Sequence, residues 1–486
     1  MARRSRGVLL PPIGASRPRR RDLYRALRNA IVEGVIPPRA RLPSSRQTAR
    51  DYGVSRGTVE EVFGQLADEQ FIERRVGRGT FVTGRSVGSR TERPGRHAPK
   101  SPSRRGLSLV SGPTCRESAI LRPFNAGVAD TTSFPWGSWR RLQSRAASEL
   151  GAAAMSFADP RGLPTLRAAI ARYLAQFRDF RCDAGQIIVF NSAQQAILAL
   201  ALLLLDPDDA VWLEDPCYPG ARAALETAGA RIVPVPVDPD GLRVDDGKRL
   251  APRARMVYAT PAHQYPTGVV LTESRRGELL DWAAANDAWI IEDDYDGEFR
   301  YDGPPRAPLA ADGARARVLY VGTLSKSMFV SLRLAFAVVP EELVEPLATV
   351  RTYLDGFTPP VAQLTMSMFM DEGHFATHLR AMRNVYGARR QALVDVVGEL
   401  SGRGWTWPQE AAGLHLLLRH DRASHVRSVA ATAGELELTL LGGYRLGHAR
   451  GEGLFLRFAG LDVPTIERGA EILVAAAARG APSSTP

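Results

Sequence analysis

Lysine is almost absent from this sequence, which contains only Lys100, Lys248 and Lys326. The other basic side chains are arginines, and a guanidinium stays protonated and cannot form a Schiff base. A lysine amine can form one once its pKa is lowered. Lys326 follows the apolar run 318–321, which is typical of a buried strand. A charge there is costly unless it is paired or used chemically, although an ordinary surface lysine in a turn is the alternative.

Cysteine is equally scarce, with three widely spaced residues at Cys115, Cys182 and Cys217. An odd and dispersed set argues against a disulfide framework and against a zinc site, so we expect no metal and a reducing, cytoplasmic location. Long apolar runs are also missing. The longest, near residues 196–205, spans about ten residues, about half of what a bilayer requires. No apolar segment of signal-peptide length opens the chain, so we expect no membrane partner.

Acidic residues are depleted in one part of the chain. Residues 1–110 contain 24 Lys and Arg against 9 Asp and Glu, whereas the remainder contains 39 basic and 43 acidic side chains. The formal net charge of +11 therefore comes from the first quarter of the chain. A concentrated basic segment favours a polyanionic partner, nucleic acid first. For residues 1–21 a solvated arginine-rich tail is the alternative.

The basic quarter has the pattern of a helix-turn-helix followed by a hairpin. Residues 1–18 predict a disordered tail, and a helical pattern starts at Asp22. Ser44 or Ser45 can cap a short helix that ends before Gly53, and Ser55 can cap a second helix. In such a unit the second helix enters the major groove with its first residues at the base edges, here residues 55–58. Two β-type runs flanking residues 77–79 predict a basic hairpin along the phosphate backbone.

This block resembles the winged helix-turn-helix of the GntR family of bacterial regulators. The resemblance rests on the runs Leu42-Pro43-Ser44-Ser45-Arg46, Tyr52-Gly53-Val54-Ser55-Arg56-Gly57-Thr58-Val59 and Gly77-Arg78-Gly79-Thr80. It implies DNA contacts from Arg46, Ser55, Arg56, Thr58, Gly77, Arg78, Gly79 and Thr80. Relatives often carry a second arginine on the recognition helix where this chain has Glu60, so the base contacts and the operator sequence stay open.

The composition divides the chain into four parts. After the basic tail, residues 19–84 predict the DNA-binding domain. Residues 85–118 are rich in Arg, Ser, Gly and Pro and predict a flexible linker, which either adds nonspecific DNA attraction or only provides spacing. Residues 119–480 alternate strand-like and helical runs, which predicts an α/β domain with a mostly parallel sheet and helices on both faces. The expected strands are 187–190, 210–213, 232–235, 256–259, 289–292 and 318–321, and the expected helices include 194–205 and 275–286.

Polar residues follow several of these strands, where the carboxyl ends of parallel strands meet and ligands bind. A pyridoxal phosphate site needs a lysine, a carboxylate against the ring nitrogen, phosphate donors at a helix N-terminus and an aromatic face. Each requirement has a candidate. Lys326 would supply the amine, Asp293 the carboxylate, and Tyr295 would emerge on the same side as Asp293. The phosphate donors would be Ser192, Ala193, Gln194, Thr323 and Arg333. Tyr218 would supply the aromatic face.

In this order, these residues resemble the fold-type I aminotransferases. The resemblance implies a Schiff base between Lys326 and pyridoxal phosphate, Asp293 on the pyridine nitrogen, Tyr295 on the ring hydroxyl and Tyr218 stacked on the ring. It also implies that Arg457, in the expected strand 453–458, holds a substrate or effector carboxylate, with a sheet-edge arginine as the alternative.

One run departs from ordinary aminotransferases, because Tyr265 stands where they carry an asparagine. The run His263-Gln264-Tyr265-Pro266, together with residues 292–301, is characteristic of the MocR subfamily, in which a GntR domain is fused to an aminotransferase-like domain. The chain is thus identified as a member of that subfamily, which includes the PdxR and GabR types. The resemblance implies a homodimer.

Three functions are compatible with these features. The first is a transcription regulator that binds double-stranded DNA and senses pyridoxal phosphate, or its adduct with an amine or amino acid, with vitamin B6 or amino-acid metabolism as its target. The second is a working aminotransferase with a DNA-binding extension. The third, a dimerisation scaffold, is disfavoured by the retained Lys326, Asp293 and Arg333. The basic helix-turn-helix favours the first, because a metabolic enzyme does not need it.

Overall fold

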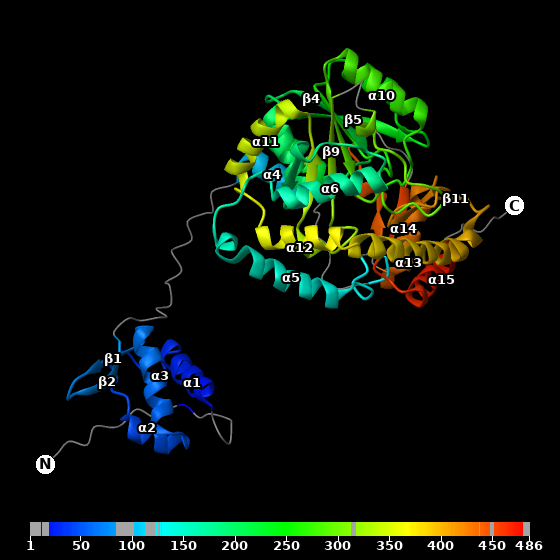
Figure 1. Cartoon of the computed structure of the whole chain (residues 1–486). Helices are drawn as coiled ribbons and strands as arrows, with labels where there is room; N and C mark the ends of the chain where they lie inside the picture. Colours follow the sequence, from blue (N-terminus) through cyan, green and yellow to red (C-terminus); the bar gives the residue numbers. More distant parts are fainter. Residues whose placement is uncertain are drawn as a thin grey trace. The chain divides into compact units, whose positions relative to one another are not determined.

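A computed structural model describes residue 11 and residues 19–83, 102–111, 122–124, 127, 129–312, 317–436, 438–447 and 452–479. The chain forms two compact units that divide between Ser101 and Pro102, and we describe each by itself (Figure 1). Within the described residues, the helices are too short or too polar to cross a membrane. Most of the predicted tail, 1–18, lies outside the described residues. Pro11 is the exception, since its carbonyl accepts a 2.7 Å hydrogen bond from the Tyr52 hydroxyl.

The smaller unit is the predicted winged helix-turn-helix. Its elements are α1 (Arg20–Val32), α2 (Ser45–Tyr52), α3 (Arg56–Asp68), β1 (Ile72–Arg75) and β2 (Gly79–Val82). Ser44 caps α2 by accepting a hydrogen bond from the Gln47 N–H, and Gly53 ends the helix with a φ of 63°. The three helices and the antiparallel β1–β2 hairpin pack around one apolar cluster. Helix α3 contributes four buried side chains to this cluster, which fix it against the rest of the unit.

The larger unit is built on an eight-stranded sheet in the order β3-β10-β9-β8-β7-β4-β5-β6. Its strands are β3 (Ile187–Phe190), β4 (Ala210–Asp215), β5 (Arg231–Asp238), β6 (Gly241–Leu242), β7 (Met256–Ala259), β8 (Trp289–Asp294), β9 (Arg317–Thr323) and β10 (Ala335–Val338). The five strands from β9 to β5 are parallel, and β10 is antiparallel to both of its neighbours. Every expected strand is present, and the mostly parallel sheet is confirmed, but β10 was not expected.

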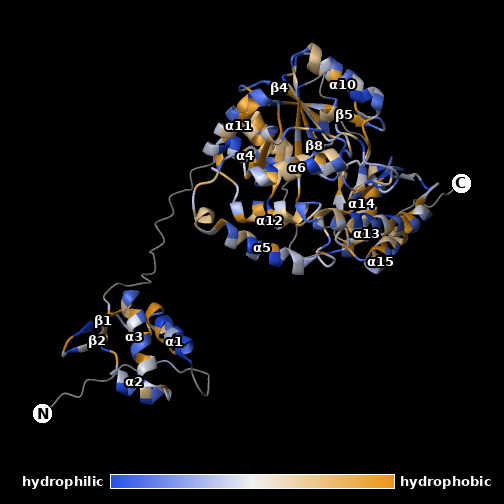
Figure 2. Ribbon diagram, in the orientation of Figure 1, coloured by the Kyte–Doolittle hydropathy of each residue, from blue (hydrophilic) through white to orange (hydrophobic). Residues whose placement is uncertain are grey.

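Helices cover both faces of this sheet, and the strands between them are hydrophobic (Figure 2). One face packs against α7 (Ala193–Leu204), α8 (Pro219–Ala228) and α11 (Glu341–Leu354). The other packs against α6 (Pro164–Phe177), α9 (Val244–Leu250), α10 (Glu273–Ala285) and α12 (Pro360–Asp371), beside which α5 (Trp136–Leu150) lies. Burial on both faces explains why the strands are continuous apolar runs in the sequence.

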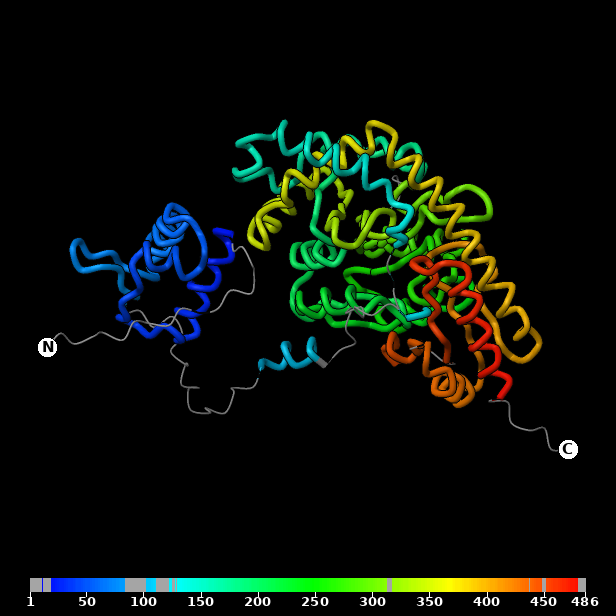
Figure 3. Tube along the Cα trace, turned by 90° about the horizontal axis from the view of Figure 1, so that it is seen from below, coloured from blue at the N-terminus to red at the C-terminus, as the bar shows by residue number. Residues whose placement is uncertain are grey.

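A smaller antiparallel sheet follows in the order β11-β12-β14-β13. Its strands are β11 (Trp405–Thr406), β12 (His415–His420), β13 (Thr439–Leu440) and β14 (Glu452–Arg457). It packs against α14 (Ala423–Thr432), and the long helix α13 (His374–Val397) runs alongside α15 (Val463–Arg479), as Figure 3 shows.

Part of the predicted linker is helical. Residues 104–111 form α4 (Arg104–Ser111), and the Ser108 hydroxyl donates to Glu226 of α8 at 3.4 Å. The predicted linker, 85–118, therefore contains one short helix, whose Leu107, Leu109 and Val110 side chains are exposed. Residues 85–101 and 112–118 of the predicted linker lie outside the described residues.

Candidate functional sites

Lys326 lies in the loop that joins β9 to the antiparallel β10. Its Nζ donates a hydrogen bond to the Gly127 carbonyl at 2.9 Å, and the Leu324 N–H donates to the Leu334 carbonyl across the base of the loop. Thr323 ends β9, and its hydroxyl accepts from the Ser325 N–H at 3.2 Å. The loop thus presents the lysine at the carboxyl edge of the sheet, where sequence reasoning expected it.

Asp293 and Asp294 end the neighbouring strand β8 and point in opposite directions. Arg178 donates to the Asp294 carboxylate in a fully buried ion pair, and the Tyr320 hydroxyl adds a hydrogen bond at 2.8 Å. Asp293 has no cationic partner among the described residues. One of its oxygens accepts from the Tyr258 hydroxyl at 2.7 Å, and the other is buried without a hydrogen bond. Burial raises the pKa of Asp293 to about 7, and the Tyr258 hydrogen bond opposes that rise.

This geometry fits pyridoxal phosphate. A buried carboxylate oxygen that lacks a partner can accept a hydrogen bond from a protonated ring nitrogen, which would also supply the missing positive charge. The register places Asp293 beside Val321, two residues before the end of β9, so Asp293 and Lys326 lie at the same edge of the sheet. Lys326 would hold the cofactor and Asp293 would face its ring nitrogen.

Tyr295 belongs to a small hydrogen-bonded group that sequence reasoning missed. Its hydroxyl lies 3.0 Å from His263 Nδ1, and the same nitrogen lies 3.0 Å from a carboxylate oxygen of buried Asp296. His415 lies beside them. One ring nitrogen each of His263 and His415 and a carboxylate oxygen of Asp296 lie within 4.8 Å of one another, and all three residues are buried. The sequence signal for this group is the run at residues 263–266, which indicates the subfamily but does not predict these hydrogen bonds.

Aromatic side chains surround Tyr265, the residue that replaces the usual asparagine. Tyr218 and Tyr295 each meet its ring edge-to-face with centroids 5.7 Å apart. Arg457, on β14, donates to the Tyr444 hydroxyl at 3.0 Å, and its guanidinium lies 4.7 Å from the centre of the Phe455 ring. The same cluster therefore brings Tyr218, Tyr295 and Arg457 together, which favours the predicted effector site over an isolated sheet-edge arginine.

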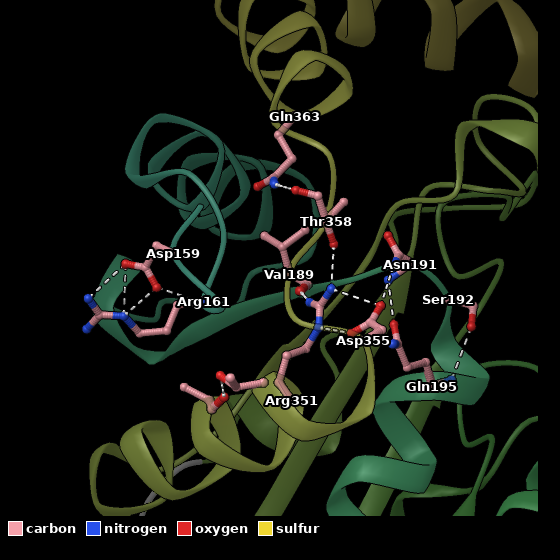
Figure 4. A network of polar contacts seen from close by, with 12 residues as sticks. Asp159, Arg161, Val189, Asn191, Ser192, Gln195, Arg351, Asp355, Thr358 and Gln363 are labelled. Carbon is pink, nitrogen blue, oxygen red and sulfur yellow. Dashed lines mark hydrogen bonds and ion pairs between the residues drawn. The ribbon is translucent and has the colours of Figure 1, made fainter. Parts of the chain in front are cut away.

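The turn from β3 into α7 contains the predicted phosphate donors. Ser192 caps α7 by accepting from the Gln195 N–H at 3.1 Å, with Ala193 and Gln194 following as the first helical residues. Figure 4 shows what holds this turn. The Asn191 amide donates to Asp355, and Asp355 accepts from the fully buried Arg351 at 2.9 Å. The helix start is as expected, but Gln194 and Arg333 are exposed in the single chain.

Most of the predicted DNA contacts lie on the exposed surface of the smaller unit. Arg46, Ser55, Arg56 and residues 77–79 are exposed, whereas Thr58 and Thr80 are partly buried. Ser55 caps α3, accepting from the Thr58 N–H at 3.1 Å. Gly77 and Gly79 have φ of 70° and 107°. L side chains rarely adopt a φ of 107°, so this position of the wing turn favours glycine.

Glu60, the departure from the usual arginine, has its own partners. It forms a 3.1 Å ion pair with Arg74 of β1, and Arg74 also donates to the Glu60 carbonyl. A hydrogen bond from Ser45 and the charge of Arg74 lower the pKa of Glu60. Glu60 therefore connects α3 to the wing rather than pointing its charge at a DNA phosphate.

Two known families match the chain, one for each unit. Bacterial regulatory proteins of the gntR family match residues 19–82, and the class I and II aminotransferases match residues 130–443. The probable rhizopine catabolism regulatory protein MocR of Rhizobium meliloti is 35% identical over 456 residues, covering 93% of this chain and 92% of that protein. The chain belongs to the MocR group of the GntR family. The pyridoxine biosynthesis regulator PdxR of Corynebacterium glutamicum is 30% identical over 451 residues, covering 92% and 93% of the two chains.

Solved aminotransferases share the fold of the larger unit of this MocR-group chain. The α-aminoadipate aminotransferase LysN of Thermus thermophilus matches with a TM-score of 0.67 and 23% identity, covering 78% of this chain and 95% of LysN. The kynurenine aminotransferase of Pyrococcus horikoshii gives 0.68 and 21%, covering 82% and 100%. The predicted family and fold class are therefore confirmed.

Proposed function

We propose that this chain is a sequence-specific DNA-binding transcription regulator whose larger unit binds pyridoxal phosphate at Lys326 and responds to the cofactor, or to its adduct with an amine or amino acid. The relatives MocR and PdxR are both named as regulators. A ligand can change DNA affinity only if it binds two arrangements of the protein differently. In this proposal the two units of the chain provide those arrangements.

The observation that carries the cofactor assignment is the contrast between the two aspartates at the end of β8. Asp294 is neutralised by Arg178, whereas Asp293 has a buried oxygen without a partner. When bound, pyridoxal phosphate supplies an electrophilic carbon that condenses with primary amines and a ring nitrogen that acts as an electron sink once protonated. Asp293 would keep that nitrogen protonated, Tyr258 would orient Asp293, and Tyr295 would contact the ring hydroxyl.

The remaining assignments extend this site. Ser192, Ala193, Gln194, Thr323 and Arg333 would bind the phosphate, and Tyr218 would cover the ring. Arg457 would bind an effector carboxylate through its two-pronged guanidinium. Arg333 is exposed in the single chain, which supports a homodimer in which a second subunit covers this edge. Vitamin B6 and amino-acid metabolism are the proposed targets, and the cytoplasm the proposed location.

The experiment pairs spectroscopy with DNA binding. The purified full chain loaded with pyridoxal phosphate should absorb visible light, and Lys326→Ala should remove that band while Lys248→Ala keeps it. A gel shift with the DNA upstream of the chain's own gene should be lost in Arg56→Ala. A colourless loaded wild type would overturn the cofactor assignment, and an unchanged shift with Arg56→Ala would overturn the DNA-binding assignment.

A pyridoxal phosphate-dependent aminotransferase is the second candidate function. It is favoured by the position of Arg457 near Tyr265 and Tyr295, where a substrate carboxylate could be held beside the Lys326 edge. Repeated turnover of an amino acid and a keto acid, without binding to DNA, would support it over the regulator.

A further inference from the structure

One cavity on the larger unit is lined by residues outside the Lys326 loop. It has a volume of about 550 Å³ and lies between helix α13 and the segments around residues 300–303 and 411. Cavities of this size hold small molecules. The polar side chains that line it are Arg300, Tyr301, Arg383, Asn384, Arg390 and Gln391. We call it the arginine pocket. Among the described residues, no carboxylate lines it.

Arg390 is a buried charge that forms no ion pair among the described residues, with the Asp302 carboxylate acting on it only from a longer range. Only 6% of it is exposed. Its hydrogen bonds are to the carbonyls of Pro408 and Glu410, at 3.2 and 2.8 Å, and its buried Nε has no partner within the described part of the chain. The Glu410 carboxylate is already paired with Arg306 at 2.8 Å. Carbonyl groups solvate a guanidinium only partly, so a buried cation of this kind favours an anion nearby.

Arg383 adds a second guanidinium of the same kind. Its Nε donates to the Glu298 carbonyl at 2.7 Å, and one of its terminal nitrogens is buried without a partner among the described residues. No carboxylate of the described chain forms an ion pair with either Arg383 or Arg390, whereas Arg300 has Asp302 at 3.5 Å. Arg383 and Arg390 are seven residues apart on α13, which puts them two turns apart on one face.

We propose that the arginine pocket is a second ligand site, which binds a small phosphate-bearing molecule. Two or three guanidinium groups, with Asn384 and Gln391 beside them, provide the forked donors that phosphate oxygens accept. A concave pocket suits a small phosphate ester better than the continuous backbone of DNA, which is bound by convex elements and extended grooves. This site does not rest on the proposed function, because none of its residues belongs to the Lys326 site.

The wall of the pocket is continuous with the Tyr295 group. The Tyr301 hydroxyl donates to the Gly413 carbonyl at 2.7 Å. Gly413 lies directly against the His263 ring, since an added Cβ would come within 1.9 Å of it. His263 in turn contacts Tyr295 and Asp296. A ligand that displaces Tyr301 would therefore press on the residues beside the predicted cofactor ring.

The test measures phosphate binding by the full chain. Inorganic phosphate is titrated by calorimetry in chloride buffer of constant ionic strength, with pyridoxal phosphate present in saturating amount. Saturable binding is expected, weakened at least tenfold in Arg383→Gln and Arg390→Gln. Arg380→Gln, an exposed position on the same helix that does not line the pocket, serves as the control and should bind within twofold of wild type.

Several outcomes separate the explanations. If circular dichroism shows that Arg390→Gln does not fold, the more exposed Arg383→Gln decides alone. Equal phosphate affinity in Arg383→Gln and wild type, or no saturable binding by wild type, would overturn the proposal. Loss of phosphate binding in Arg333→Gln alone would mean that only the cofactor site binds phosphate. A weaker gel shift in Arg383→Gln with unchanged phosphate binding would instead assign the pocket to DNA.

Discussion

Replacing Asp293 by asparagine should stabilise the cofactor-free protein and at the same time weaken cofactor binding. Asparagine keeps the shape of the side chain and its hydrogen bond with Tyr258 but cannot carry a charge. The pKa of Asp293 is about 7 in the folded chain, against an ordinary value of 3.8, because the carboxylate is buried. The folded state therefore keeps a proton that the unfolded state has already lost between about pH 4 and pH 7.

The sign and size of the effect follow from that difference. A raised folded-state pKa means that stability is complete below about pH 4 and is lost as the pH rises through about 7, by about 1.4 kcal/mol for each pH unit. The total is about 4 kcal/mol. Glu214, Glu292 and Glu298 are also buried with pKa values raised to about 7, but they titrate in both proteins. The charge of Asp293 also contributes to the raised pKa of Glu214, so the difference between wild type and Asp293→Asn reports Asp293 together with its coupling to Glu214.

Urea unfolding of the cofactor-free chain from about pH 5 to pH 8 measures this difference. The variant should gain about 2–3 kcal/mol relative to wild type over that range. Asp240→Asn, at an exposed site, should follow wild type at every pH. An absorbance titration should show at least a tenfold weaker affinity of Asp293→Asn for pyridoxal phosphate. A pH-independent difference in stability would refute the burial argument, and an unchanged affinity would refute the role of Asp293 opposite the ring nitrogen.

The other predictions concern the two helix starts and the network that holds one of them. Ser55→Ala should destabilise the DNA-binding unit by about 1 kcal/mol in thermal melts, because it removes the cap of α3. Ser55→Asp should retain that stability yet weaken the gel shift, because aspartate caps equally well but repels phosphate. Equal DNA binding by Ser55→Asp and wild type would exclude Ser55 from the interface. Arg351→Met should lower the free energy of unfolding by about 3 kcal/mol, since it leaves Asp355 and the Val189 carbonyl without their buried donor. A smaller loss than in the exposed control Arg380→Met would contradict this.

The parallel strands and most helix starts could be predicted from the sequence because their signals are local. Apolar runs of four to six residues marked each parallel strand, and serine caps marked α2, α3 and α7. The strand β10 escaped prediction because its four residues, Ala335–Val338, look like any short apolar segment, and its antiparallel direction depends on the tight loop after β9. Helix α4 escaped because a polar, proline-flanked composition outweighed its short apolar face.

The candidate site was predicted only in part, for a related reason. Asp293 lies at the end of a strand and Tyr295 and Lys326 follow strands, so chain order alone placed them at one edge. Tyr258 and Arg178 reach that edge from within a strand and from beyond a helix, and nothing in their local sequence says so. The pairing of Arg178 with Asp294, which distinguishes the two aspartates, joins residues 116 positions apart and exists only in the folded chain.

The Arg351 network has a mechanical consequence. Arg351 and Asp355, at the end of α11, bind the Val189 carbonyl in β3 and the Asn191 amide in the turn from β3 into α7. The two segments are thereby fastened at two points, so they should move as one rigid body. If the proposed phosphate donors at residues 192–194 bind the cofactor, a signal that starts there would be transmitted as a displacement of α11 and not as a rearrangement of the turn. Distance measurements between labels on α11 and α7 should stay constant when ligands bind, whatever the rest of the unit does.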